Sequence, residues 1–380
     1  MRNYFNNKQG VTASSYGLVV GLIAIVALAA TTQIGGNVNS LFGTVDNSLT
    51  EAAGQSESSP SALPSASPLF SFSSHTFTTC GQTGRTGPDL TTCRSAYSTT
   101  WDEDNANFNM TTNGIQRWTV PETATYRITA SGAQGAGNDP CSGCGSSLAG
   151  AEGAVIEGEF DMNEGDILQI LVGQQGLGRG GPHGNENGGG GGTFVVDDSN
   201  NAIIIAGGGG GGPGTAGHGQ SCVRSTTWGH GQSGTGTLSF TCNVTMSSRT
   251  GPDGGLASTS NGGAAGGGLT GNGANGGAHC NTSTAGQSFT NGGVGGNGLS
   301  CYTHPSYPNH DPDGGFGGGG AGDLASPGGG GGYAGGSVAA SWSQRSTYGG
   351  GGSSFNSGLN PNNSTGGNTG HGSVVIEKLP

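Results

Sequence analysis

The distribution of hydrophobic and polar residues separates an N-terminal segment from the rest of the chain. Residues 11–45 carry no charged side chain, and the stretch from Tyr16 to Ala30 is almost wholly apolar. From Ile34 to Leu49 the apolar residues recur mostly at steps of three and four, which indicates that the run continues as an amphipathic helix. The pattern therefore predicts a long hydrophobic α-helix over residues 11–50.

Further along the chain, polar and apolar residues alternate over short segments, which is the pattern of β-strands. One pair of such segments is separated by Asp161–Gly165 and another by Asp197–Asn201. Both of these short loops are expected to form hairpin turns. Strands joined in this way indicate a mainly β fold, an antiparallel β-sandwich or TNF-like jelly roll. The predicted strands are Ile115–Val120, Tyr126–Ile128, Ala154–Phe160, Asp166–Val172, Thr193–Val196, Ala202–Ala206 and Ser373–Ile376. The predicted core residues are Trp118, Val120, Tyr126, Ile128, Val155, Phe160, Ile167, Ile170, Val172, Phe194 and Ile204.

Glycine dominates the C-terminal part of the chain. The sequence has 85 glycines in runs of up to six, and their irregular spacing excludes a collagen triple helix. A flexible linker is one interpretation, because glycine has the largest backbone freedom. The runs, however, begin or end at predicted strands, and large residues such as Phe316 and Tyr333 lie beside them. We therefore expect packed polyglycine helices with three residues per turn, joined by backbone hydrogen bonds.

A Ser-, Ala- and Pro-rich stretch, residues 51–69, lacks apolar periodicity and predicts an extended linker. It divides the N-terminal helix from a glycine-rich β-sandwich domain of residues 70–380.

Charge and motif content argue against nucleic-acid binding and catalysis. Only 9% of the residues are charged and the net charge is −12, so the chain has no basic stripe for phosphates. The sequence lacks a Gly-Lys phosphate loop, a His-Glu-x-x-His motif and a Gly-x-Ser-x-Gly motif. Asp102–Asp104 and the pair Asp311 and Asp313 could bind calcium, but solvated loops are favoured for them and for the eight histidines. We expect no enzyme, no cofactor and no metal site.

All eight cysteines lie between Cys80 and Cys301, and their even number predicts disulfides formed in an oxidising compartment. Sequence alone does not fix the connectivity, although the spacing suggests pairs of neighbours. For the Cys-x-x-Cys at Cys141 and Cys144, a small structural disulfide is favoured over a redox or zinc motif. The neighbouring pairs are Cys80–Cys93, Cys141–Cys144, Cys222–Cys242 and Cys280–Cys301.

The stretch Gly10–Leu18 resembles the processing site and helix start of Flp-type (type IVb, tight adherence) pilins. The resemblance implies a leader of residues 1–10 that a prepilin peptidase cleaves between Gly10 and Val11. It also implies that Tyr16 is the tyrosine of the family and that Ser15 replaces its glutamate, which pairs with the N-terminal amine of a neighbouring subunit. A tip or minor subunit would fit that replacement. The open alternatives are a secretory signal peptide and a plain transmembrane anchor.

The body of the chain resembles a second family. Cys80–Pro88, Gly114–Pro121 and Leu171–Gly176 are similar to segments of the extracellular glycine-rich domain of anaplastic lymphoma kinase and its relatives. The resemblance implies a TNF-like β-sandwich that carries a bundle of polyglycine helices and binds protein ligands. It also implies a disulfide between Cys80 and Cys93.

Together these features suggest a subunit of a bacterial type IV (Flp/Tad-like) pilus that displays the glycine-rich domain for adhesion or filament decoration. The expected partners are other pilin subunits, prepilin peptidase, the inner membrane before assembly, and an unknown surface ligand on the extracellular pilus. The alternative is a secreted or membrane-anchored glycine-rich binding protein that forms no filaments. The candidate contact residues, each equally consistent with local packing, are Trp228, Tyr302, Tyr307 and Trp342.

Overall fold

The computed structural model describes one compact unit, which falls within Ser67–Pro380. Residues 1–66 and several internal segments lie outside the described residues. The described ranges are 67–137, 149–178, 187–213, 226–237, 240–242, 244–246, 248–257, 262–277, 283–298, 311–323, 326–338 and 349–380.

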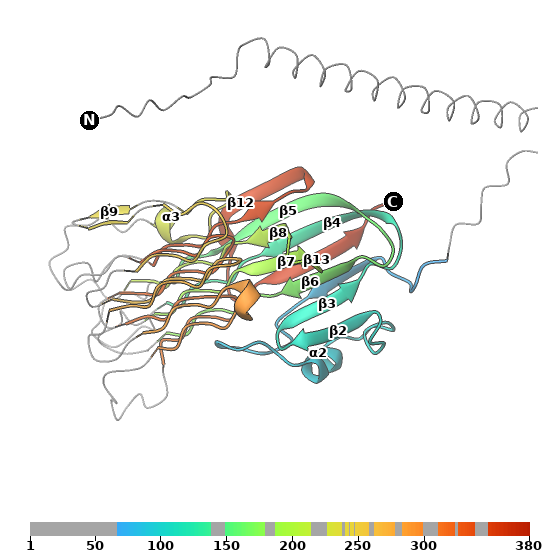
Figure 1. Cartoon of the computed structure of the whole chain (residues 1–380), viewed down its shortest axis with the longest axis horizontal. Helices are drawn as coiled ribbons and strands as arrows, with labels where there is room; N and C mark the ends of the chain where they lie inside the picture. Colours follow the sequence, from blue (N-terminus) through green and yellow to red (C-terminus); the bar gives the residue numbers. More distant parts are fainter. Residues whose placement is uncertain are drawn as a thin grey trace, which may run out of the picture. The chain divides into compact units, whose positions relative to one another are not determined.

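Two antiparallel sheets form the centre of the unit (Figure 1). The first has the strand order β1-β13-β4-β5-β12, and the second has the order β11-β8-β7-β6-β3-β2. The strands of the first sheet are β1 (Ser74–Phe77), β13 (Ser373–Lys378), β4 (Ala124–Ser131), β5 (Gly153–Met162) and β12 (Leu359–Asn368). Those of the second are β11 (Phe355–Asn356), β8 (Ala202–Ala206), β7 (Thr193–Asp197), β6 (Ile167–Leu171), β3 (Ile115–Thr119) and β2 (Phe108–Thr112).

The remaining elements are short. A separate pair of strands, β9 (Phe240–Cys242) and β10 (Val244–Met246), forms a two-stranded ladder. The described helices are α2 (Leu90–Ala96), α3 (Thr226–Gly229) and the 3₁₀ turn η1 (Phe289–Asn291). The carboxylate of Asp89 caps α2, because it accepts a hydrogen bond of 2.7 Å from the backbone N–H of Thr92.

Alternation along the strands produces the core between the two sheets. In β4, Tyr126, Ile128 and Ala130 point inward and are buried, while the residues between them are partly exposed. Trp118 of β3 and Ile156 of β5 meet these side chains from the two sheets, and all are fully buried. This shared apolar layer makes the two sheets a sandwich.

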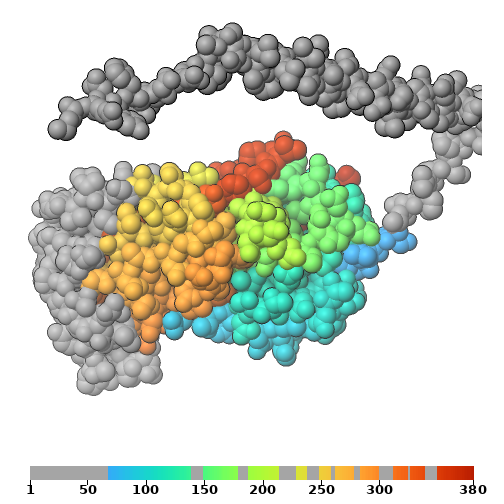
Figure 2. Space-filling model, viewed as in Figure 1, coloured from blue at the N-terminus to red at the C-terminus, as the bar shows by residue number. Residues whose placement is uncertain are grey.

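The second sheet is buried on its other face as well. Leu171, Phe194 and Ile205 point away from the first sheet and pack against Phe289 and Phe316, which come from glycine-rich segments. Figure 2 shows these segments, in yellow to orange, packed against the green part of the chain that contains the central strands. A few large side chains therefore attach the glycine-rich region to the sandwich.

We call the glycine-rich segments together the glycine bundle. They run as extended stretches beside one another in Figure 1. The bundle consists of residues 132–137, 149–152, 173–178, 187–192, 207–213, 254–257, 262–277, 283–298, 311–323, 326–338 and 349–353.

Hydrogen bonds within the glycine bundle repeat every third residue. The N–H groups of Gly208 and Gly211 donate to the carbonyl oxygens of Gly331 and Gly328 at 2.7 and 2.9 Å, so these two segments are antiparallel. The N–H groups of Gly209 and Gly212 donate to Ala133 and Ala136 at 2.9 and 2.8 Å, so that neighbour is parallel. A step of three residues towards each neighbour is the repeat of the polyproline II helix.

The close spacing of these segments requires glycine. A Cβ atom built on Gly209 would lie inside van der Waals contact with the carbonyl oxygen of Ala151, and one on Gly191 would overlap the carbonyl oxygen of Phe316. The segments approach so closely because no side chain separates them, and their buried backbone groups then satisfy one another. Ordered packing, rather than a flexible linker, describes these glycine runs.

One part of the expected fold class is wrong. The longest helix among the described residues is α2, with seven residues, and none of the described helices has the length and apolar character needed to cross a membrane. The fold class that the described residues show is therefore an antiparallel β-sandwich with a glycine bundle, and no long α-helix is part of these residues. The predicted helix, residues 11–50, lies outside the described residues. The pilin and transmembrane-helix assignments and the inner-membrane stage are accordingly withdrawn.

Candidate functional site

The described surface contains a hollow where the two sheets end together. Its volume is about 400 Å³, within the range of roughly 300–1,000 Å³ typical of ligand sites. Residues from the end of β5, the start of β6 and the end of β7 line it, with single residues from β8 and the turn before β12. The lining residues are Phe160, Asp161, Met162, Asp166, Ile167, Leu168, Asp197, Asp198, Ser199, Ile203 and Ser357.

The hollow combines an apolar floor with an acidic rim. Phe160, Met162 and Leu168 are buried core residues that form part of its lining, while Ile167 and Ile203 are partly exposed. Four of the lining residues are aspartates and none is a lysine, arginine or histidine. Partly exposed isoleucines beside several carboxylates indicate a surface suited to an amphipathic ligand.

Two of the four carboxylates are held by the protein itself. Asp197 ends β7 and organises the following turn, because it accepts hydrogen bonds of 2.8 Å from the backbone N–H groups of Ser199 and Asn201. Burial alone would raise the pKa of Asp197, but the hydrogen bonds from Asn201 and Ser199 outweigh it and lower that pKa. Asp198 forms an ion pair with Arg117 of β3 through one of its oxygens.

The other two carboxylates are exposed and accept hydrogen bonds from neutral groups. Asp161 accepts a hydrogen bond of 2.6 Å from the hydroxyl of Thr125 at one oxygen. Asp166 accepts one of 2.8 Å from the backbone N–H of Asn163, also at one oxygen. Both residues are exposed, and each hydrogen bond fixes its carboxylate at the end of a strand. Each side chain is thereby oriented while its second oxygen is available to a ligand.

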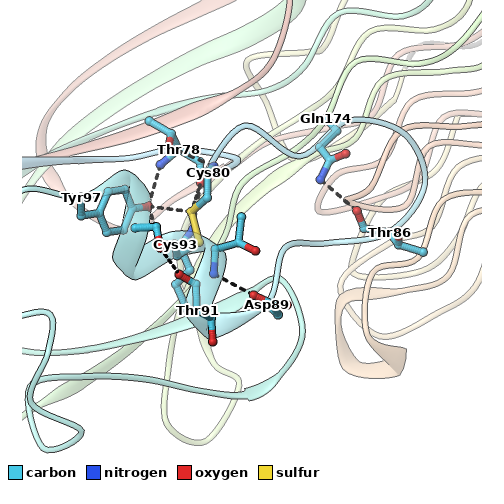
Figure 3. Close-up of a disulfide and its surroundings, with 11 residues drawn as sticks. Thr78, Cys80, Thr86, Asp89, Thr91, Cys93, Tyr97 and Gln174 are labelled. Carbon is cyan, nitrogen blue, oxygen red and sulfur yellow. Dashed lines mark hydrogen bonds between the residues drawn. A yellow bond between two sulfur atoms is a disulfide. The ribbon is translucent and has the colours of Figure 1, made fainter.

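The predicted disulfide between Cys80 and Cys93 is present, and both residues are buried (Figure 3). It ties the segment after β1 to α2. Nearby, the hydroxyl of Tyr97 accepts a hydrogen bond of 3.0 Å from the N–H of Thr78 and donates one of 2.6 Å to Gln116. The disulfide is thus part of the packed core and has no direct role in the hollow.

Among the residues that the structure describes, none of the other predicted site residues lines the hollow. Trp228 is buried against Ala151, so it is packed inside the unit rather than presented as a contact. Asp102, expected in a solvated loop, is 1% exposed, and His75, expected in a loop, lies in β1. The backbone of Cys242 is part of β9. Outside the described residues lie Gly10, Val11, Ser15, Tyr16, Cys141, Cys144, Cys222, Cys280, Cys301, Tyr302, Tyr307 and Trp342.

The fold defines the class of the described unit: an antiparallel β-sandwich with an attached glycine bundle and a surface hollow. Over 117 residues the chain is 36% identical to the leukocyte tyrosine kinase receptor of Mus musculus. The matched part is 31% of this chain but 12% of that receptor, so the chain spans a small fraction of this relative. No family model matches the chain. The similarity agrees with the resemblance to the anaplastic lymphoma kinase group, and nothing in it concerns pilins.

Proposed function

We propose that the described unit is a non-catalytic binding module that uses the hollow to hold part of a partner protein. The observation that carries this proposal is the hollow itself, because its apolar floor is partly exposed where strands of both sheets end. Sites of this kind bind ligands through a preformed surface, which reduces the conformational entropy lost on binding.

Three features support this function. The partly similar mouse protein is a receptor by name, although the match covers a small share of it. The Cys80–Cys93 disulfide is typical of proteins in oxidising compartments, where secreted and surface proteins work. The carboxylates around the hollow are exposed or bound to turns and to Arg117, without the burial that usually tunes a catalytic acid or base. A binding protein that forms no filaments fits these features best.

A peptide-display selection on the immobilised full chain tests this function. We expect enrichment of peptides that bind wild type but lose binding to Ser199→Trp, because Ser199 is an exposed lining residue and a tryptophan there would fill the hollow without changing its charge. Thermal unfolding of the variant, matched to wild type, would control for folding. A selection that enriches nothing over uncoated beads would contradict a binding function. Enriched peptides that bind Ser199→Trp as well as wild type would place the site elsewhere.

A further inference from the structure

We propose that the hollow recognises an arginine side chain on a segment of the partner protein. This inference rests on the proposed function and specifies the chemistry of the ligand. An arginine has an aliphatic stem and a planar guanidinium with several donors, so it matches both parts of the hollow.

The rim provides the acceptors. Asp161, Asp166 and Asp198 come from three different positions around the hollow, and each has a hydrogen bond or ion pair recorded at one carboxylate oxygen only. The second oxygen of each can accept from a ligand. A guanidinium can donate to more than one carboxylate at the same time, whereas a lysine ammonium concentrates its charge at one point.

The floor provides the surface for the stem. Ile167 and Ile203 are partly exposed, and they lie beside the buried Phe160 and Leu168. The methylene groups of an arginine would cover this apolar surface while the charged end remains at the rim. The volume of about 400 Å³ also leaves room for neighbouring residues of an extended segment.

Charge complementarity selects this occupant over two others. A wholly apolar segment would cover the floor but would desolvate the four aspartates without giving them a partner, which is costly. A bare metal ion has no suitable ligand set here, because no group of three or more His, Cys, Asp or Glu side chains in the described parts of the chain is placed to hold one. A cationic group with an apolar stem satisfies both halves of the hollow.

The test uses two pools of short synthetic peptides with identical random flanks and either arginine or its neutral isostere citrulline at the centre. Fluorescence anisotropy measures their binding to the full chain. We expect the arginine pool to bind about 10-fold more tightly, because its charge-assisted hydrogen bonds are lost in citrulline. The double variant Asp161→Asn/Asp166→Asn should remove that difference. Ile203→Ala should weaken both pools by about 3-fold, since the stem and its flanks lose apolar contact.

Glu103→Gln is the matched control, because it removes the same kind of charge at an exposed position outside the hollow. It should leave the difference between the pools unchanged. Equal affinity for the arginine and citrulline pools would overturn the inference, and so would an equal loss in Glu103→Gln and the double variant. If display-selected peptides bind in the hollow but carry no arginine, the inference fails while the binding function stands. If the selection yields no binding peptide, the binding function fails as well.

Discussion

The sandwich and the glycine bundle are stabilised in opposite ways within one compact unit. Between the sheets, large side chains such as Trp118 and Tyr126 are fully buried, so the removal of apolar surface from water is the main favourable contribution. In the bundle, neighbouring segments touch through their backbones, and hydrogen bonds between Gly209, Ala133 and their equivalents satisfy the buried peptide groups. The comparison shows that large side chains stabilise the sandwich, whereas any side chain in the glycine bundle would prevent the close approach of its segments.

The sharpest test of this difference adds one methyl group to the bundle. In Gly209→Ala the new Cβ would overlap the carbonyl oxygen of Ala151, so the segments must separate. The bonds from Gly209 N–H to Ala133 and from Gly190 N–H to the Gly209 carbonyl would then be lost or stretched. Each of the two N–H donors left unsatisfied costs about 1–3 kcal/mol. We therefore expect a loss of about 2–6 kcal/mol in the free energy of unfolding, measured by urea titration.

Gly234→Ala is the matched control for this substitution. A Cβ at Gly234 meets no atom within 4 Å, and its φ is outside the left-handed region. The alanine should be neutral or should stabilise by up to about 1 kcal/mol, because it restricts the unfolded chain. Equal destabilisation by both alanines would refute the account of the bundle.

The disulfide gives the next largest expected effect. Cys80 and Cys93 close a loop with a sequence separation of 13, for which the chain-entropy model gives about 3 kcal/mol. We expect the double variant Cys80→Ala/Cys93→Ala to lose about 2–4 kcal/mol of unfolding free energy in urea titration. Comparison with Cys80→Ser/Cys93→Ser would separate the loss of the cross-link from the burial of polar groups. An unchanged urea midpoint in the alanine variant would show that the cross-link contributes nothing to stability.

In the sandwich, removing a methyl group should have a smaller effect than adding one to the bundle. Ile156 of β5 is fully buried in the layer between the sheets. We expect Ile156→Val to lower the unfolding free energy by about 0.5–1.5 kcal/mol, since the cavity left is small. Differential scanning calorimetry would measure it. A loss as large as that of Gly209→Ala would remove the contrast between the two regions.

The last expected effect is a dependence of stability on pH, which disappears at neutral pH. Burial among Phe77, Tyr97 and Trp101 lowers the pKa of His75 to about 4, although Asp102 partly opposes this. The unfolded chain, in which His75 has its ordinary pKa of about 6.5, therefore binds the proton first. Stability from neutral His75 is complete above about pH 6.5 and falls as the pH drops towards 4.

Urea midpoints measured between pH 7 and pH 4 check this expectation. The urea midpoint of His75→Gln should fall less steeply with decreasing pH than that of wild type. The difference in slope should correspond to less than about one proton, because only one titrating group is removed. An identical slope in both proteins would show that His75 does not gain a proton on unfolding.

The predicted strands and core were largely confirmed because alternation reflects burial directly. Nine of the eleven predicted core residues are buried. The exceptions are Val155, which lies on the outer face of β5, and Ile167, which lines the hollow. The sequence did not predict β12, because its Asn-rich segment carries no apolar pattern and its pairing with β5 depends on tertiary contact.

The hollow could not be predicted from the sequence. Its aspartates were recognised only as turn residues at the ends of predicted strands, which is their local role. The hollow brings together Asp161, Asp198 and Ser357. Their proximity depends on how β5, β7 and β12 are arranged in two different sheets. A local pattern contains no information about such a meeting of distant segments.

The pairing of the first strand with the last gives the unit a useful property. β1 and β13 are antiparallel neighbours, and the N–H of Lys378 donates a hydrogen bond of 2.8 Å to the carbonyl of Ser73. Entry and exit of the unit are therefore adjacent, and a few added residues would join them. A circularly permuted version, opened at the exposed turn of Asn163 and Glu164, should keep both sheets. For the same reason, the unit could be inserted into a single surface loop of a host protein.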